Sequence, residues 1–188
     1  NNGAVDLITG KIKLFYKNPT RPSLIELYET FFAFQQPTSI KKGCAVTANL
    51  FVSRNVFQKI GGFYQGTRSG GDFEFTSRAT KNGVKILYDE RIVVLHPARH
   101  KLKDLREKKR RIIKGFYSLR HIEPAMACEF SIVRIIKHLL PPILSFKTVY
   151  TLKIPIRISA IDRLKIMFVV YYYKIFSFWY KLEIVSKK

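Results

Sequence analysis

The sequence predicts an α/β domain followed by a basic helical region. Up to about residue 100, short runs rich in β-branched and aromatic residues alternate with helical patterns, and Gly, Pro and Asn separate them. From residue 101 on, apolar residues recur at near-helical spacing among many lysines and arginines. We therefore divide the 188 residues into an α/β part, residues 1–100, and a basic amphipathic helical region, residues 101–188.

The chain opens with extended sequence and a capped helix. Residues 3–16, GAVDLITGKIKLFY, alternate apolar and polar residues around Gly10, which is typical of a strand pair or of one bent strand. Residues 18–22, NPTRP, predict a turn. Ser23, followed three positions later by Glu26 and by an apolar stripe, predicts a capping box on an amphipathic helix.

The middle of the chain alternates short strands and helices. Residues 44–53 are a β-rich run, and residues 54–63 predict a short helix that stops at Gly61 and Gly62. A second helix runs from about Asp72 to Lys81 and stops at Asn82 and Gly83. Strands are predicted at 84–89 and 91–97. A glycine-rich loop precedes the second of these helices, and Pro97, which has no N–H to donate, closes the last strand.

The basic region predicts three helical segments. They are residues 101–120, residues 130–146 with a break at Pro141–Pro142, and residues 163–185. The last segment is the most apolar, but its longest uncharged run is far shorter than the ~20 residues that a spanning helix needs. Two interpretations stay open for it: a helix that lies in a membrane interface with Trp179, or a packing helix that closes the domain.

The charge of the chain limits its partners. Lys and Arg number 34 against 13 Asp and Glu, for a formal net charge of +21, which attracts nucleic acid, anionic lipid or a diphosphate. Hydrophobic residues make up 47% and charged residues 25%, so the chain is not intrinsically disordered. The aromatic content of 14% favours a membrane surface over a duplex groove.

Two carboxylates at a helix start are candidates for chemistry. Asp72 follows three residues, Ser69 to Gly71, that include two glycines, and Glu74 lies in the first turn. One interpretation is structural. In it, Asp72 is the N-cap of the helix and the negative charge of Glu74 is stabilised by the helix dipole. Glycines beside a carboxylate also permit close approach of a ligand. His96, at the end of a predicted strand and before a basic pair, is the second candidate.

These segments together resemble a known family. TANLFVSRNVFQKIGGF and then SGGDFEFTSRATKNGVKILYDERIVVLHPAR are similar, in this order, to the C-terminal half of family 2 glycosyltransferases. The resemblance covers roughly residues 4–115. It implies part of a GT-A fold, an α/β sandwich, and transfer of a sugar from a nucleotide-diphosphate donor to an acceptor hydroxyl.

The resemblance also implies residue roles. The acidic motif of the family falls on Gly71-Asp72, which gives Asp72 the role of catalytic base in a single displacement with inversion; most relatives carry Glu where this chain has Gly71. His96 takes the place of the family histidine that completes a divalent-metal site, for Mg²⁺ or Mn²⁺, beneath the diphosphate. Arg99 and Arg78 would neutralise charge on the departing diphosphate.

Two of these roles compete with structural ones, and two more are on the acceptor side. Arg78 is spaced to pair with Glu74 at i,i+4, and this structural interpretation competes with diphosphate binding. Asn49 and Glu74 are acceptor-side candidates.

One departure from the family is large. The family motif D-x-D, which binds the metal, does not occur in this sequence, and Asp6 is the only Asp before Asp72. We therefore expect the chain to be the C-terminal portion of such an enzyme, without the N-terminal nucleotide-binding half, and to be inactive alone. The acceptor would be a glycan or lipid-linked intermediate, and the protein would bind peripherally to the anionic inner face of the cell membrane.

Two alternatives remain. A non-enzymatic basic module could bind nucleic acid or an anionic membrane through the basic run KKRRIIK, residues 108–114, and the aromatic residues. It explains the charge but not the ordered set of Asp72, Asn82-Gly83 and His96, and the sequence has no recognisable nucleic-acid-binding motif, so we expect no nucleic-acid partner. A scaffold that keeps the fold without activity is the other alternative.

Overall fold

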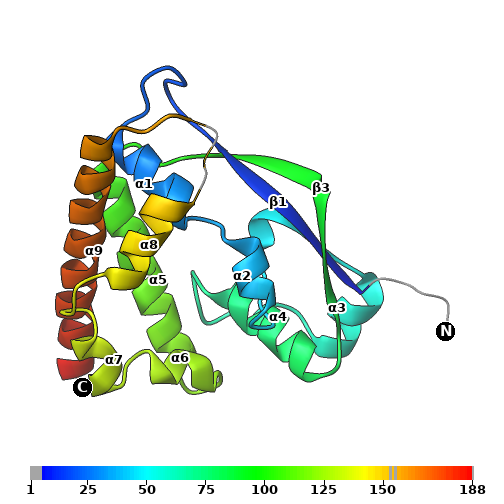
Figure 1. Ribbon diagram of the computed structural model, residues 1–188. Helices are drawn as coiled ribbons and strands as arrows, with labels where there is room; N and C mark the ends of the chain where they lie inside the picture. The colour runs from blue at the N-terminus through cyan, green and yellow to red at the C-terminus, as the bar shows by residue number, and fades with distance from the viewer. Residues whose placement is uncertain (1–5, 153, 155, 188) are drawn as a thin grey trace. The chain divides into compact units, whose positions relative to one another are not determined.

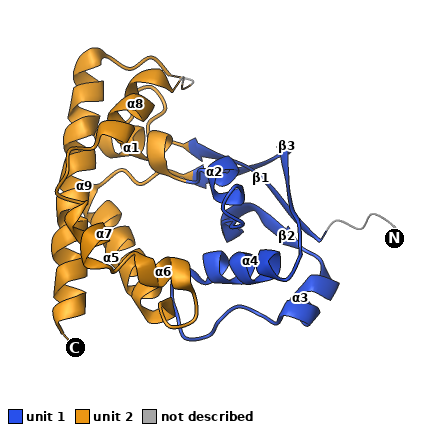
Figure 2. Cartoon of the chain, turned by 60° about the horizontal axis from the view of Figure 1, so that its bottom comes forward, with its two compact units in different colours: residues 1–14, 34–96 blue, residues 15–33, 97–188 orange. Residues whose placement is uncertain are grey.

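The computed structural model describes residues 6–152, 154 and 156–187 (Figure 1). It is a mixed α/β structure, and it divides into two compact units (Figure 2). Unit 1 comprises Asn1–Leu14 and Phe34–His96, and unit 2 comprises Phe15–Ala33 and Pro97–Lys188. The predicted domain boundary near residue 100 stays a prediction, because compactness is a different criterion and assigns the early segment 15–33 to unit 2.

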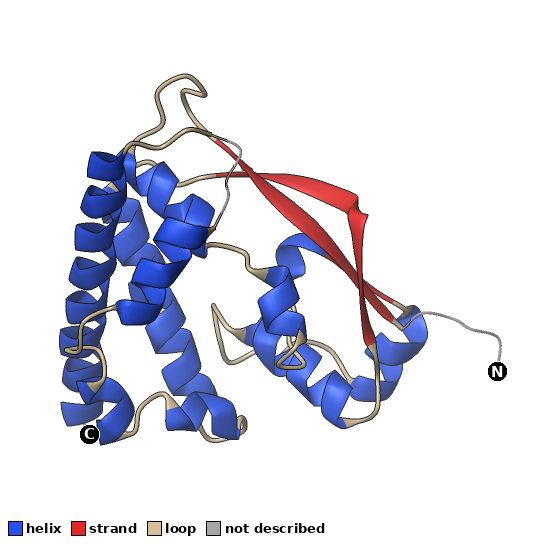
Figure 3. Ribbon diagram, viewed as in Figure 1, coloured by secondary structure: helices blue, strands red, loops and turns tan. Residues whose placement is uncertain are grey.

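The strands form one sheet in the described part of the chain (Figure 3). Its order is β2 (Leu50–Val52), β1 (Leu7–Phe15), β3 (Ile86–Pro97). β1 and β2 are antiparallel, with Leu7 opposite Val52 and Thr9 opposite Leu50. Of the two interpretations of the first extended segment, one strand is the observed one; residues 3–5 of that segment lie outside the described residues.

Unit 1 places short helices against this sheet. They are α2 (Gln36–Ile40), η1 (Thr47–Asn49), α3 (Arg54–Ile60) and α4 (Gly71–Lys81). Phe75 and Ala79, four residues apart on α4, are fully buried and pack with Leu7, Val56 and Val84 in the core of the unit. The predicted ends of α3 and α4 are confirmed: Gly61 and Gly83 both have positive φ, of 80° and 83°.

The prediction of two strands at 84–89 and 91–97 is wrong. Residues 86–97 form the single strand β3. At the predicted gap between the two strands, the Asp89 carboxylate accepts hydrogen bonds from the backbone and guanidinium of Arg91, at 2.9 and 2.7 Å. This local pairing satisfies the carboxylate at the surface without interrupting the strand.

Unit 2 is helical. It contains α1 (Leu24–Phe32), α5 (Leu102–Leu119), α6 (Pro124–Cys128), α7 (Ile132–Ile136), α8 (Ile143–Thr151) and α9 (Ala160–Ser186). The capping box on α1 is confirmed, because Ser23 accepts from the Glu26 N–H and Glu26 accepts from the Ser23 N–H. The break predicted at Pro141–Pro142 is confirmed, because the segment 130–146 contains α7 and the start of α8, separated by residues 137–142.

α9 is a packing helix of unit 2. Its residues Ile166, Val169 and Val170 are buried in one cluster with Phe31 of α1 and Leu105 of α5. The packing interpretation of this segment is therefore observed. Within the described residues, no helix combines the length and apolar character that a bilayer crossing requires.

Candidate functional site

The first turn of α4 holds Asp72. The helix begins at Gly71 with Gly70 as N-cap, so the interpretation of Asp72 as the N-cap is wrong. Gly70 has φ +84°, a left-handed conformation that glycine adopts without a steric penalty. Asp72 follows as the second helical residue, and its Oδ1 accepts the N–H of Phe73 at 3.0 Å. The negative side chain thus lies at the positive end of the helix dipole.

A buried threonine anchors this turn to the neighbouring segment. The Thr76 hydroxyl donates to the carbonyl of Asp72 at 2.7 Å and accepts the N–H of Ala45 at 3.0 Å. Thr76 and Ala45 are fully buried. Because these bonds fix the backbone of Asp72, the direction in which its carboxylate leaves the helix is set by the core of unit 1.

Glu74 and Arg78 form the ion pair that their spacing predicts. The Nε and Nη2 atoms of Arg78 donate to the two carboxylate oxygens of Glu74 at 2.6 and 3.1 Å. The same guanidinium donates to the carbonyls of Ile60 and Gly62, so it also ties α4 to the turn after α3. The hydrogen bonds that Arg78 donates to Glu74 raise the pKa of Arg78. These contacts favour the structural interpretation of Arg78, and its part in diphosphate binding stays a prediction.

Asn49 has a structural setting. Its side chain is buried, and its Nδ2 donates to the carbonyls of Lys11 and Ile92 at 3.0 and 3.2 Å, which joins β1 to β3. Gly10 makes this possible, because a Cβ there would lie 2.8 Å from Asn49 Nδ2 and 2.1 Å from the Ile92 carbonyl. Because the Asn49 side chain is buried and bonded to both strands, it is poorly placed to contact an acceptor sugar.

His96 is half-buried near the end of β3. Its ring centroid lies 4.4 Å from that of Phe34. Phe34 has φ +52°, an uncommon conformation for a non-glycine residue, and in the described residues it is the single such case. The imidazole of His96 therefore packs against the tilted aromatic ring of Phe34.

The fit of a divalent metal can be tested on the side chains present. The described residues contain no group of three His, Cys, Asp or Glu side chains that could hold a metal ion. Among the described residues, His96 therefore belongs to no group that could make a complete metal site. The catalytic role of Asp72, the metal-binding role of His96 and the acceptor-side roles of Asn49 and Glu74 stay predictions.

Arg99 belongs to unit 2 and binds a buried carboxylate there. Glu29 on α1 is 1% exposed; it accepts the N–H of Arg99 at 2.8 Å, the Arg99 guanidinium at 3.2 Å and the Lys108 ammonium at 2.8 Å. Burial alone would raise the pKa of Glu29, but the charge of Lys108 and the bonds from Arg99 outweigh it and lower the pKa. These contacts hold α1 to the start of α5, and the spacing of 70 residues gave no sequence signal for the pair.

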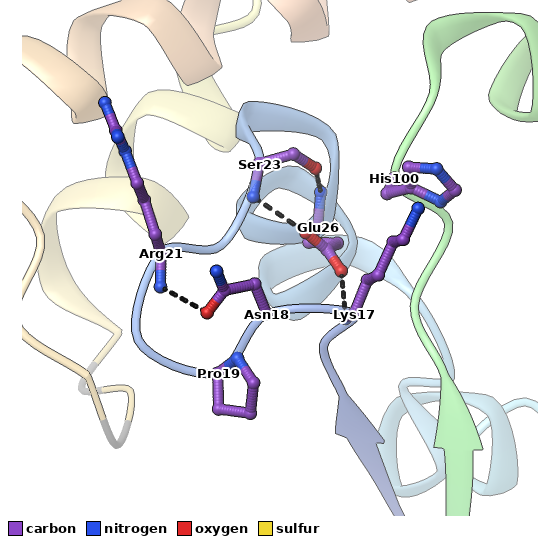
Figure 4. A pocket seen from close by; sticks show the side chains of 7 residues that line it. All are labelled: Lys17, Asn18, Pro19, Arg21, Ser23, Glu26 and His100. Carbon is purple, nitrogen blue, oxygen red and sulfur yellow. Dashed lines mark hydrogen bonds between the residues drawn. The ribbon is translucent and has the colours of Figure 1, made fainter.

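Unit 2 also has an open surface pocket of about 440 Å³ at the start of α1 (Figure 4). Both oxygens of the Glu26 carboxylate accept backbone N–H groups, of Lys17 and Ser23, each at 2.7 Å. Burial would raise the pKa of Glu26, but these bonds outweigh it and lower the pKa. The Lys17 side chain extends toward His100, whereas Arg21 points away (Figure 4). The pocket is therefore lined by a carboxylate that binds backbone N–H groups, by the cationic side chains of Lys17 and Arg21, and by the imidazole of His100.

Comparison with known proteins places these features in context. The α/β structure with its three-stranded sheet and several helices is consistent with part of a glycosyltransferase domain. Over 112 residues, 59% of the chain, the sequence is 36% identical to Glycosyltransferase AglE of Haloferax volcanii. The chain spans 36% of the length of that relative. No protein-family model matches the chain. The similarity supports a relationship between the chain and glycosyltransferases.

Proposed function

We propose that the chain is the C-terminal part of an inverting family 2 glycosyltransferase with a GT-A fold. The enzyme would transfer a sugar from a nucleotide-diphosphate donor to a hydroxyl of a glycan or lipid-linked acceptor. The observation that carries this proposal is the 36% identity to Glycosyltransferase AglE over 112 residues. The setting of Asp72, in the first turn of α4 behind Gly70, supports it.

In the proposed reaction Asp72 is the general base. A carboxylate with an ordinary pKa of about 3.9 does not deprotonate an alcohol in advance; it accepts the proton as the acceptor oxygen attacks the anomeric carbon. The new carbon–oxygen bond forms on one face of the sugar, while the bond to the donor phosphate breaks on the other. The nucleoside diphosphate leaves with the bonding electrons, and the anomeric configuration inverts.

The test is the variant Asp72→Asn in the polypeptide that the complete gene encodes. We expect the transfer rate to fall by about 10²-fold or more, as for loss of a general base, with donor affinity unchanged. Glu90→Gln, at an exposed carboxylate in β3 of the same unit, is the matched control and should keep full activity. Undiminished transfer by Asp72→Asn would exclude the proposed base.

We further propose that a divalent metal, Mg²⁺ or Mn²⁺, accompanies the donor and that His96 is its one ligand from this chain. Titration with Mn²⁺, followed by its electron paramagnetic resonance signal, should show weaker binding to the full-length His96→Ala variant than to the wild type. Unchanged Mn²⁺ affinity would assign His96 to its contact with Phe34 instead.

We propose peripheral association with the anionic inner face of the cell membrane as the location of this reaction. The net charge of +21 supports it, since lysines and arginines near an anionic leaflet each contribute about 1 kcal/mol.

A further inference from the structure

The segment between α7 and α8 exposes apolar side chains. Residues 139–146, LLPPILSF, are here called the proline turn. Ile143 is 74% exposed and Leu144 is 83% exposed, and Leu140 and Phe146 each expose more than half of their surface. Large apolar side chains this exposed and this close together mark an interaction surface in a soluble protein.

The carbonyls before the two prolines are satisfied inside unit 2. Leu139 O accepts the hydroxyl of Tyr171 at 3.3 Å, and Leu140 O accepts the ammonium of Lys174 at 2.7 Å. Both donors come from α9. The two prolines interrupt the helix at this point, and the two α9 side chains donate to these carbonyls.

The prolines themselves add no unsatisfied group. They have no N–H, and their carbonyls accept the N–H groups of Ile143 and Phe146 at 3.0 and 2.9 Å. A backbone segment that enters the apolar part of a bilayer must have its polar groups paired within the protein, because lipid offers no partner. The four successive carbonyls of residues 139–142 meet this condition while the side chains remain exposed. The N-cap of α8, Pro142, makes no side-chain bond to the first N–H groups of that helix, which suits the polar headgroup region rather than the centre of the bilayer.

The charge around the turn is of one sign. From Phe130 to Ile161 the sequence contains no Asp or Glu. Lys137 before the turn and Lys147 after it are both exposed, and Arg134 lies one helical turn before Lys137. An apolar tip bordered by exposed cations complements a surface with negative headgroups above hydrocarbon. It would not complement a neutral or cationic surface.

We infer that the proline turn inserts into the headgroup and upper acyl region of an anionic bilayer and holds unit 2 at the membrane. Ile143 and Leu144 are the inserted side chains, and Lys137 and Lys147 contact the headgroups. This inference rests on the proposed membrane location, and it is independent of sugar transfer. The occupant is lipid rather than a protein partner, because satisfied carbonyls and cations bordering the tip are both properties that a bilayer selects.

The test is binding of the 188-residue chain to vesicles, which requires no activity. The vesicles contain phosphatidylcholine and phosphatidylglycerol in equal amounts, or phosphatidylcholine alone. We expect the double variant Ile143→Ser/Leu144→Ser to bind the anionic vesicles roughly tenfold more weakly or worse than the wild type, because the apolar transfer of two side chains is lost. The matched control Phe51→Ser/Leu87→Ser removes two exposed apolar side chains from unit 1 and should bind like the wild type.

A second measurement reports insertion directly. The chain has one tryptophan, Trp179, so Leu144→Trp in a Trp179→Phe background places the only indole on the turn. Its emission should shift to the blue with anionic vesicles and stay unchanged with phosphatidylcholine alone. A wild-type chain that binds neither vesicle overturns both the membrane location and the inference. Equal binding by the double variant, or no blue shift, overturns the inference alone and leaves attachment by charge.

Discussion

Loss of the Glu29 carboxylate should destabilise unit 2 strongly. Glu29→Gln keeps the size and shape of the side chain but removes the negative charge between Arg99 and Lys108. Removal of one partner from a buried ion pair costs about 3–5 kcal/mol, because the remaining charge stays buried without compensation. The Arg99 and Lys108 side chains are 24% and 18% exposed, so water relieves part of that cost. We therefore expect the free energy of unfolding to fall by about 3 kcal/mol, the lower end of the range.

Urea unfolding followed by far-UV circular dichroism measures this change. Glu107→Gln is the control, because Glu107 is an exposed carboxylate on α5 and its replacement should change stability by no more than about 0.5 kcal/mol. If the two variants unfold at the same urea concentration, the carboxylate of Glu29 does not stabilise unit 2 and the reasoning fails.

The same pair predicts a pH dependence. The folded state lowers the pKa of Glu29, so its stabilisation is complete above the ordinary carboxyl pKa of about 4.3 and is lost as pH falls through the lower folded-state pKa. The difference in stability between wild type and Glu29→Gln should therefore be constant near neutral pH and narrow below about pH 4. If the difference in stability between the wild type and Glu29→Gln increased at acidic pH, the folded state would not lower the pKa of Glu29.

Two further variants test the start and the side of α4. Gly70→Ala forces a Cβ onto a left-handed backbone and should cost roughly 1–2 kcal/mol in urea unfolding, whereas Gly71→Ala, whose Cβ would meet Thr67 at an ordinary 3.7 Å, should be tolerated. Arg78→Lys loses the fork that binds Glu74 and two carbonyls, so we expect roughly 1–3 kcal/mol lower stability with an unchanged KM for the donor; unchanged stability with a raised KM would instead support a diphosphate role.

Local sequence signals predicted the elements whose ends depend on near neighbours. The capping box needs only Ser23 and Glu26, three residues apart, and the observed bonds are the predicted ones. The stop at Gly61 likewise depends on one residue that tolerates positive φ. The pair of Glu74 and Arg78 was predictable for the same reason, since one helical turn brings the two side chains together.

Distant contacts decided what the sequence did not predict. Tyr28 and Phe31 of α1 are buried against Leu105, Val149 and Ile166, all more than 70 positions later in the chain, and this packing places an early helix in unit 2. No local pattern encodes such a partner. The apolar stripe of α1 shows only that one face is covered, and it does not show by what.

Distant contacts also explain why the sequence predicted the setting of Asp72 but not that of Arg99. In the sequence, Arg99 is a cation beside a histidine with no acidic residue close by. In the structure, Arg99 binds Glu29, which lies 70 positions away. Asp72 is a candidate because of its place behind glycines at a helix start and because of the resemblance, and the structure confirms that place. Arg78 and Asn49 hold neighbouring segments together through their side chains, which the sequence spacing predicted for Arg78 and not for Asn49.

The formal charge of +21 overstates what a partner meets. Lys181 is buried and bonded to Glu129 at 2.9 Å, so it does not face solvent. Burial, with the charge of Lys181 nearby, lowers the pKa of Lys109 to about 8, so part of its population is neutral in mildly alkaline solution. Attraction to an anionic surface must therefore come from exposed cations such as Lys137 and Lys147. Those two border the most exposed apolar side chains of unit 2, and this coincidence, rather than the total charge, favours a membrane over a nucleic acid.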